Sequence, residues 1–227
     1  MLHLLGLILG LVLAAPVAAG HLTPEGEQLI TKHEVGGQAT YTRKYQAPVC
    51  PACLTTASGV TFGIGYDLRH NSPEKIRGDW ATHPKLPRLL AAQGLGGQQA
   101  IDMARSMRDV ITPWSMALQN FREVGIVPYI SRTRRAFGPN FDRLSPWAQD
   151  ALVSLVYNRG NSMVGPARVE MRFIRDVCLP LWKTAELANQ CIARKLREMI
   201  RIWVGSSIEG GMRNRRNDEA NLALFLR

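Results

Sequence analysis

Three side chains near the start of the chain could together cleave a glycosidic bond. Glu34 could donate a proton to the leaving oxygen, Asp67 could activate the attacking water molecule, and the Thr61 hydroxyl could hold that water. A proton donor of this kind needs apolar surroundings, and Val35 beside it supplies some of that surface. Each residue alone has a commoner structural explanation, since Asp often forms turns and Thr favours strands. Only the combination supports a catalytic hypothesis.

A helix that ends near Gly36 would position Glu34. Thr23 can cap its start, Pro24 suits the first helical position, and Glu25 suits the positive end of the helix dipole. Gly36 predicts the end of this helix, which places Glu34 in its last turn.

Residues 59–66 predict a strand, because apolar side chains alternate there with small or polar ones. Gly63 and Gly65 lie on the face opposite the apolar one and leave space for a ligand to approach closely. We expect these glycines and Tyr66 to bind substrate, with Glu34 facing them across a cleft.

The rest of the chain is predicted to be mainly helical, so the fold class is α+β. Residues 70–88 contain three prolines and are expected to form a loop. Apolar side chains at helical spacing predict five helices, at residues 100–111, 114–124, 146–158, 186–204 and 218–226.

The first 19 residues resemble an export signal. Residues 4–15 form an apolar run, shorter than the roughly 20 residues that span a membrane. Small residues predict cleavage after Ala19. Because only the amino terminus and His3 precede the run as positive groups, a releasable signal anchor and a buried helix stay open as alternatives. Residues 20–227 would then form one functional domain, exported to the periplasm or secreted.

Export makes disulfides the expected state of the cysteines. Four are present, and local pairing of Cys50 with Cys53 and of Cys178 with Cys191 is favoured among three pairings. The first pair could instead be half of a zinc site, but no second Cys-x-x-Cys or His pair follows. A thioredoxin-like role would need a βαβ unit, which the sequence does not suggest. No metal or organic cofactor is expected.

The segment SGVTFGIGYDL at residues 58–68, preceded by Glu34, resembles the phage-type lysozymes. In that family a catalytic Glu ends the first helix and a Thr-x-Gly-x-Gly strand faces the cleft. Many members carry an Asp shortly before this strand, whereas residues 54–58 contain none. The Ser-Gly-Val-Thr start and the Tyr-Asp-Leu end look closer to the pesticin-like muramidase branch. The resemblance assigns its Glu, Thr and Asp roles to Glu34, Thr61 and Asp67.

Two later segments extend the resemblance. Residues 151–160, ALVSLVYNRG, are similar to the central buried helix of these enzymes, and residues 211–220, GMRNRRNDEA, to their Gly-Leu-x-x-Arg-Arg-x-x-Glu-Ala ending. Asn158 and Arg159 are expected to bind substrate. The resemblance implies a small N-terminal lobe with a β-hairpin and a larger helical C-terminal lobe.

A net charge of +10 favours anionic partners. Without a nucleic-acid-binding motif, we expect peptidoglycan and an anionic cell envelope rather than nucleic acid. Membrane contact is expected only through the N-terminal segment, and the protein is expected to be a monomer. Four arginines could contact anionic peptide stems, although coating the surface is the favoured interpretation: Arg159, Arg213, Arg215 and Arg216. Arg215 or Arg216 could instead pair with a buried acid.

The resemblance implies a muramidase that hydrolyses the β-1,4 bond between MurNAc and GlcNAc. Attack by water from the face opposite Glu34 would invert the anomeric carbon and require carboxylates roughly 6.5–9.5 Å apart. Two alternatives remain open at this stage. A lytic transglycosylase would use Glu34 alone and leave an anhydro-sugar, and a non-enzymatic basic protein would permeabilise envelopes through its charge.

Overall fold

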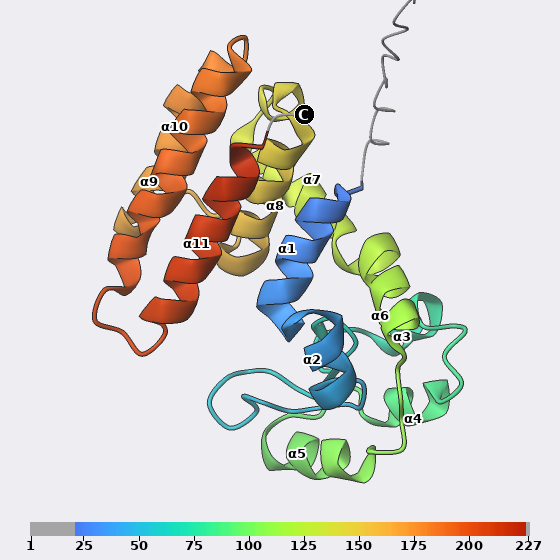
Figure 1. The fold of residues 1–227 in the computed structure, drawn as a ribbon. Coiled ribbons are helices and arrows are strands. Elements are labelled where there is room, and N and C mark those ends of the chain that lie inside the picture. Colours follow the sequence, from blue (N-terminus) through green and yellow to red (C-terminus); the bar gives the residue numbers. More distant parts are fainter. Residues whose placement is uncertain (1–20, 226–227) are drawn as a thin grey trace, which may run out of the picture.

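Helices make up most of the described chain, which is residues 21–225 of a computed structural model (Figure 1). The predicted signal segment, residues 1–19, lies outside the described residues. The α-helices are α1 (Pro24–Val35), α2 (Gly37–Lys44), α3 (Pro73–Asp79), α4 (Leu86–Ala91), α5 (Gly97–Ser106), α6 (Trp114–Asn120), α7 (Val127–Phe137), α8 (Pro146–Arg159), α9 (Val169–Phe173), α10 (Ala185–Glu198) and α11 (Glu209–Ala223).

Short turns of π- and 3-10 helix join several of these elements. The π-helical turns are η1 (Phe121–Gly125) and η4 (Ile174–Cys178), and the 3-10 turns are η2 (Phe141–Arg143), η3 (Pro166–Arg168), η5 (Leu179–Leu181) and η6 (Met199–Trp203). Strands β1 (Thr61–Phe62) and β2 (Tyr66–Asp67) form an antiparallel hairpin, in which Thr61 lies opposite Asp67. A helical fold with one small antiparallel sheet is consistent with the predicted α+β class.

The first helix forms as its sequence predicts. The Thr23 hydroxyl accepts a hydrogen bond from the Gly26 N–H at 3.0 Å, and Pro24 occupies the first turn. At the other end Gly36 adopts a left-handed conformation, with φ of 71°, and its N–H donates to the Lys32 carbonyl. The predicted end of this helix is therefore confirmed.

The larger of two hydrophobic cores surrounds α8. This helix is largely apolar, and its Ala148 and residues 150–156 are buried, as expected for a helix enclosed by others. Helices α1, α7 and α11 pack on it, and α10 packs against α11 (Figure 1). The second core is smaller and holds Phe62 and Tyr66 of the hairpin together with Trp80 and residues of α3 and α5.

Three sequence-based predictions were wrong. Residues 70–88 contain α3 and part of α4, because Pro73 and Pro87 occupy first-turn positions instead of breaking helices. Helix α11 starts at Glu209, not near residue 218, and runs through Gly210 and Gly211. In place of one strand over residues 59–66, the chain forms two short strands, Thr61–Phe62 and Tyr66–Asp67, around a turn.

Both predicted disulfides are present. Cys50 pairs with Cys53, and Cys178 of η4 pairs with Cys191 of α10. Disulfides of this kind fit an oxidising, exported compartment. None of the helices within residues 21–225 is long and apolar enough to span a bilayer.

Candidate active site

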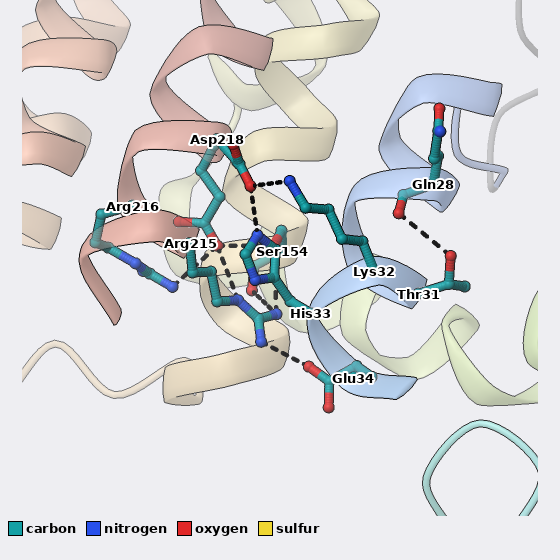
Figure 2. Close-up of polar contacts among 10 residues, drawn as sticks. Gln28, Thr31, Lys32, His33, Glu34, Ser154, Arg215, Arg216 and Asp218 are labelled. Carbon is teal, nitrogen blue, oxygen red and sulfur yellow. Dashed lines mark hydrogen bonds and ion pairs between the residues drawn. The ribbon is translucent and has the colours of Figure 1, made fainter. Parts of the chain in front are cut away.

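Glu34 projects from the last turn of α1 with about a quarter of its side chain exposed, at 25%. Its Oε1 accepts a hydrogen bond from Arg215 Nη1 at 2.6 Å. In Figure 2 the second carboxylate oxygen points away from Arg215 and from the labelled residues of α11. One oxygen is thus fixed by an ion pair, while the other faces away from it.

Arg215 itself is held inside a buried polar cluster. Its Nε donates to Glu219 at 3.3 Å, and Arg216 donates to the same Glu219 oxygen at 2.9 Å. The Ser154 hydroxyl of α8 donates to that oxygen at 2.7 Å. Together with Glu34, this cluster contains two carboxylates and two guanidinium groups, so its formal charges cancel. Both Arg215 and Arg216 thus pair with a buried acid, which the sequence left open as an alternative, and the favoured surface role is wrong for these two arginines.

A second polar contact ties α1 to α11 beside this cluster. Asp218 accepts from Lys32 at 2.7 Å and lies 2.8 Å from His33 Nε2 (Figure 2). Burial lowers the pKa of His33, although the Asp218 contact opposes that shift. These contacts and the Arg215 pair fix the end of α1 that carries Glu34.

The hairpin turn depends on two glycines. Gly63 and Gly65 have φ of 56° and 76°, a region that L side chains rarely adopt. A Cβ on Gly63 would lie 3.1 Å from the Trp80 ring, and one on Gly65 would lie 3.3 Å from the Tyr157 hydroxyl. These glycines therefore serve the turn and its packing, which the prediction of a ligand-facing strand did not anticipate.

Asp67 and Thr61 both contact Gly59. The Gly59 N–H lies 3.2 and 3.1 Å from the two Asp67 carboxylate oxygens, and the Arg69 N–H donates to Asp67 at 2.8 Å. The Thr61 hydroxyl donates to the Gly59 carbonyl at 3.2 Å. The sulfur atoms of Cys50 and Cys53 lie 3.4 and 3.3 Å from the same carbonyl oxygen, so this oxygen connects the cysteines to the hairpin.

Tyr66 is a core residue of the hairpin. Its hydroxyl donates to Asp79 of α3 at 2.7 Å, and only 8% of the residue is exposed. Burial raises its pKa, and the bond to Asp79 adds to that rise. Tyr66 therefore positions the hairpin on α3.

Asn158 and Arg159 contact the C-terminal part of the chain and not the hairpin. Asn158 accepts from Arg216 at 3.0 Å, and Arg159 donates to the Ala167 carbonyl at 2.6 Å while its guanidinium lies 5.0 Å from the Trp203 ring centroid. Burial, together with neighbouring arginines, lowers the pKa of Arg159 to about 10. Through these contacts the two residues hold the end of α8 against later parts of the chain, namely η3, η6 and α11.

Tyr157 is the site residue that the sequence analysis missed. Its hydroxyl faces Gly65 of the hairpin, and its pKa is raised by burial and further by the negative charge of Glu34. It also packs on Tyr129 of α7, with ring centroids 4.4 Å apart. The sequence feature that could have indicated Tyr157 is its position directly before Asn158, which was expected to bind substrate.

A hollow of ≈ 280 Å³ opens beside the hairpin. Asp67, Gly65 and Tyr157 line it, whereas Glu34 is not among its lining residues. Tyr157 lines the hollow together with Asp67, and the negative charge of Glu34 contributes to the rise in its pKa.

The arrangement suits proton transfer by side chains. Among residues 21–225, no group of three His, Cys, Asp or Glu side chains is placed to hold a metal ion. The groups considered for this role are the Asp67 carboxylate and the Tyr157 hydroxyl, which line the hollow, and the Glu34 carboxylate at the end of α1. Comparison of the sequence with protein-family models and with curated proteins gives no match.

Proposed function

We propose that the protein is an exported muramidase that hydrolyses the bond between MurNAc and GlcNAc in peptidoglycan. The observation that carries this proposal is the Glu34 carboxylate, which is partly exposed at the end of α1 and oriented by Arg215 at 2.6 Å. A general acid must be held in position and remain accessible to the substrate, and the ion pair together with the partial exposure of Glu34 supports this role.

In the proposed reaction, Glu34 gives its proton to the glycosidic oxygen as the bond to the anomeric carbon breaks. Water adds to that carbon from the opposite face and passes a proton to Asp67, while Thr61 orients the water. The product is a reducing sugar of inverted configuration. A net charge of +10 favours approach to the anionic envelope, and the protein acts as a monomer without a metal or organic cofactor.

Glu34→Gln is the variant that tests this role. It keeps the shape of the side chain and removes its proton, so we expect release of reducing ends from purified peptidoglycan to fall by about 10²–10⁴-fold. Glu27→Gln is the matched control, because Glu27 lies on the same helix and pairs with Arg122. Full activity of Glu34→Gln with an intact fold would disprove the assignment.

A lytic transglycosylase is the second candidate, favoured by one observation. Both Asp67 oxygens already accept hydrogen bonds from the backbone N–H groups of Gly59 or Arg69, so this carboxylate has a structural role in the hairpin. A transglycosylase would need Glu34 but no water-activating carboxylate. Mass spectrometry of digested peptidoglycan separates the two, since a transglycosylase leaves anhydro-sugars and a hydrolase leaves reducing ends.

A further inference from the structure

A second hollow, of ≈ 410 Å³, lies beside the Cys50–Cys53 disulfide, and we call it the Cys50 hollow. One wall is the segment before and around Cys50, and the other wall comes from α5 and the turn that follows it, at the lower edge of Figure 1. The described residues that line it are different from those that line the hollow beside the hairpin. The Cys50 hollow is therefore a separate feature of the molecule.

The wall that carries Cys50 is held in place by backbone hydrogen bonds. Val49 forms an antiparallel bridge with Thr61 of β1, in which each N–H donates to the other residue's carbonyl at 2.8 Å. Nearby, the Gln46 carbonyl accepts from the Thr112 N–H at 2.7 Å. A wall that is fixed before a ligand arrives lowers the cost of ordering on binding.

The two sulfur-bearing residues of this disulfide differ in accessibility. Cys50 is partly exposed and lines the hollow, whereas Cys53, with 4% of the residue exposed, is not among the described residues that line it. Thiol–disulfide exchange begins when a thiolate attacks one sulfur of a disulfide and expels the other. A ligand in the hollow meets Cys50, which makes Cys50 the residue attacked and Cys53 the leaving group.

Arginines give the Cys50 hollow its charge. Arg105 and Arg108 are exposed, and no acidic side chain is among the described residues that line it. Arg105 shares its charge with Asp102 at 3.4 Å, whereas Arg108 pairs with no carboxylate within residues 21–225. Arg43 and Lys44 add two exposed cations at the end of α2, directly before the other wall in the sequence. These charges favour an anionic ligand.

Apolar side chains form the rest of the hollow. Pro48 and Val49 lie on the wall that carries Cys50, and Ile101 and Ala104 of α5 lie on the other. Such walls suit methylene groups, and a volume of ≈ 410 Å³ falls within the roughly 300–1,000 Å³ of small-molecule pockets.

The three features together select one class of ligand. A disulfide reacts with a thiol, the arginines match carboxylates, and the apolar walls match a short carbon chain that joins the two groups. Inorganic phosphate has neither the thiol nor the carbon chain. A thiol that carries an ammonium group alone would be repelled by the arginines.

We propose that the Cys50 hollow binds a small thiol with carboxylate groups, and that this thiol exchanges with the Cys50–Cys53 disulfide. The thiolate forms a bond to the Cys50 sulfur, the bond between the cysteines breaks, and its electron pair passes to Cys53, which takes a proton from water. The product is a mixed disulfide at Cys50. A second thiolate then attacks the sulfur of the bound thiol, which releases Cys50 as a thiolate, so the cysteine pair is reduced and two thiols are oxidised to their disulfide.

Exchange kinetics with two thiols test the role of charge. Glutathione is the anionic probe and 2-mercaptoethanol the neutral one, and mass spectrometry after acid quenching gives the rate constant for each. Arg108→Ala should lower the rate constant for glutathione by about 3–5-fold, the size expected for one exposed ion pair, and Arg105→Ala with Arg108→Ala by about 10-fold. The rate constant for 2-mercaptoethanol should stay at the parental value in both variants.

Arg135→Ala is the matched control for these variants. It removes the same charge from an exposed position on α7, outside the described lining of the Cys50 hollow, so it should leave both rate constants unchanged. Unchanged exchange with glutathione in the folded double variant would overturn the proposal. An equal loss of rate with both thiols would do so as well, because a neutral thiol gains nothing from the arginines.

The position of attack is tested separately. Peptide mapping of the parent should find the glutathione adduct on Cys50. With one cysteine of the pair replaced, oxidised glutathione should modify Cys50 in Cys53→Ala at least about 10-fold faster than Cys53 in Cys50→Ala, because Cys53 is buried. Adducts mainly on Cys53 would contradict the proposal.

The second disulfide is the internal control for unfolding. Cys178 is fully buried in the larger core, so exchange at Cys178–Cys191 requires that core to open and should be much slower than at Cys50. Equal rates at the two disulfides would show that exchange follows unfolding and would overturn the proposal. None of these measurements uses peptidoglycan or Glu34, so their outcome is independent of the muramidase proposal.

Discussion

Arg215 of α11 holds the Glu34 carboxylate of α1 at 2.6 Å, although 181 positions separate the two residues along the chain. The same guanidinium donates to Glu219, of which no part is exposed. Arg215 therefore joins a partly exposed candidate acid to a fully buried one, and its loss should affect both stability and activity.

Arg215→Met should lower the free energy of unfolding by about 3 kcal/mol or more, because it breaks a buried ion pair and leaves the two carboxylates of Glu34 and Glu219 with one guanidinium group, that of Arg216. Arg213→Ala is the control, since Arg213 forms an exposed pair with Glu209 and should cost about 1 kcal/mol or less. Urea unfolding of both variants measures the difference. Equal midpoints would show that the cluster around Glu219 adds no stability.

Asp150 should make stability depend on pH. Burial raises its pKa from 3.8 to about 7, against the opposing effect of hydrogen bonds from the Thr23 N–H and hydroxyl. Between these two values the folded protein holds a proton that the unfolded chain has released. The stabilisation from this proton is therefore fully present below pH 3.8 and is lost as the pH rises to about 7. Over this range the free energy of unfolding falls by up to about 1.4 kcal/mol per pH unit.

Asp150→Asn removes this titration, so its free energy of unfolding should change less between pH 5 and 7 than that of the parent. Urea titrations at several pH values measure the slope. Asp109→Asn, at an exposed aspartate, should keep the parental slope. A parental slope in Asp150→Asn would rule out Asp150 as the titrating group.

Gly63→Ala should destabilise the hairpin through two effects. The left-handed backbone costs a non-glycine residue about 1–2 kcal/mol, and crowding against Trp80 adds about 1–3 kcal/mol. Gly94→Ala is the matched control for the backbone effect alone, because Gly94 has φ of 76° and no atom lies within 4 Å of an added Cβ. Thermal unfolding should place Gly63→Ala clearly below Gly94→Ala, and coincident curves would show that the Trp80 contact is unimportant.

The two disulfides should differ in their effect on stability. Cys178–Cys191 closes a loop with a sequence separation of 13, and Cys50–Cys53 one with a separation of only 3. Loop entropy predicts about 3 kcal/mol for the first and about 1 kcal/mol less for the second. Paired Cys→Ala variants, compared by urea unfolding, measure this order, and a larger loss for the Cys50 pair would contradict it.

Local signals predicted the helix that carries Glu34. Thr23, Pro24 and Gly36 act through contacts within a few residues, so their roles could be read from the sequence. The hairpin glycines were harder, because period-two alternation also runs through residues 63–65 of the turn and does not reveal where a strand reverses.

Contacts between distant segments could not be predicted in the same way. That Arg215 contacts Glu34 depends on how α11 packs against α1 and α8, and the sequence only left such a pairing open. Tyr157 was missed because a tyrosine on a buried helix is usually a packing residue. Asn158 and Arg159 face other partners than expected, since one step around α8 changes the direction of a side chain by about 100°.

Gly59 contacts both the Cys50–Cys53 disulfide and two side chains of the hairpin, Asp67 and Thr61. The Gly59 N–H donates to the Asp67 carboxylate, and the Gly59 carbonyl accepts a hydrogen bond from the Thr61 hydroxyl. The same carbonyl oxygen lies close to both sulfur atoms of the Cys50–Cys53 pair. No larger residue fits, because a Cβ would lie 2.6 Å from the Leu95 carbonyl oxygen. The Cys50–Cys53 pair, Asp67 and Thr61 therefore all depend on the position of one backbone residue, and any displacement of Gly59 would alter these contacts together.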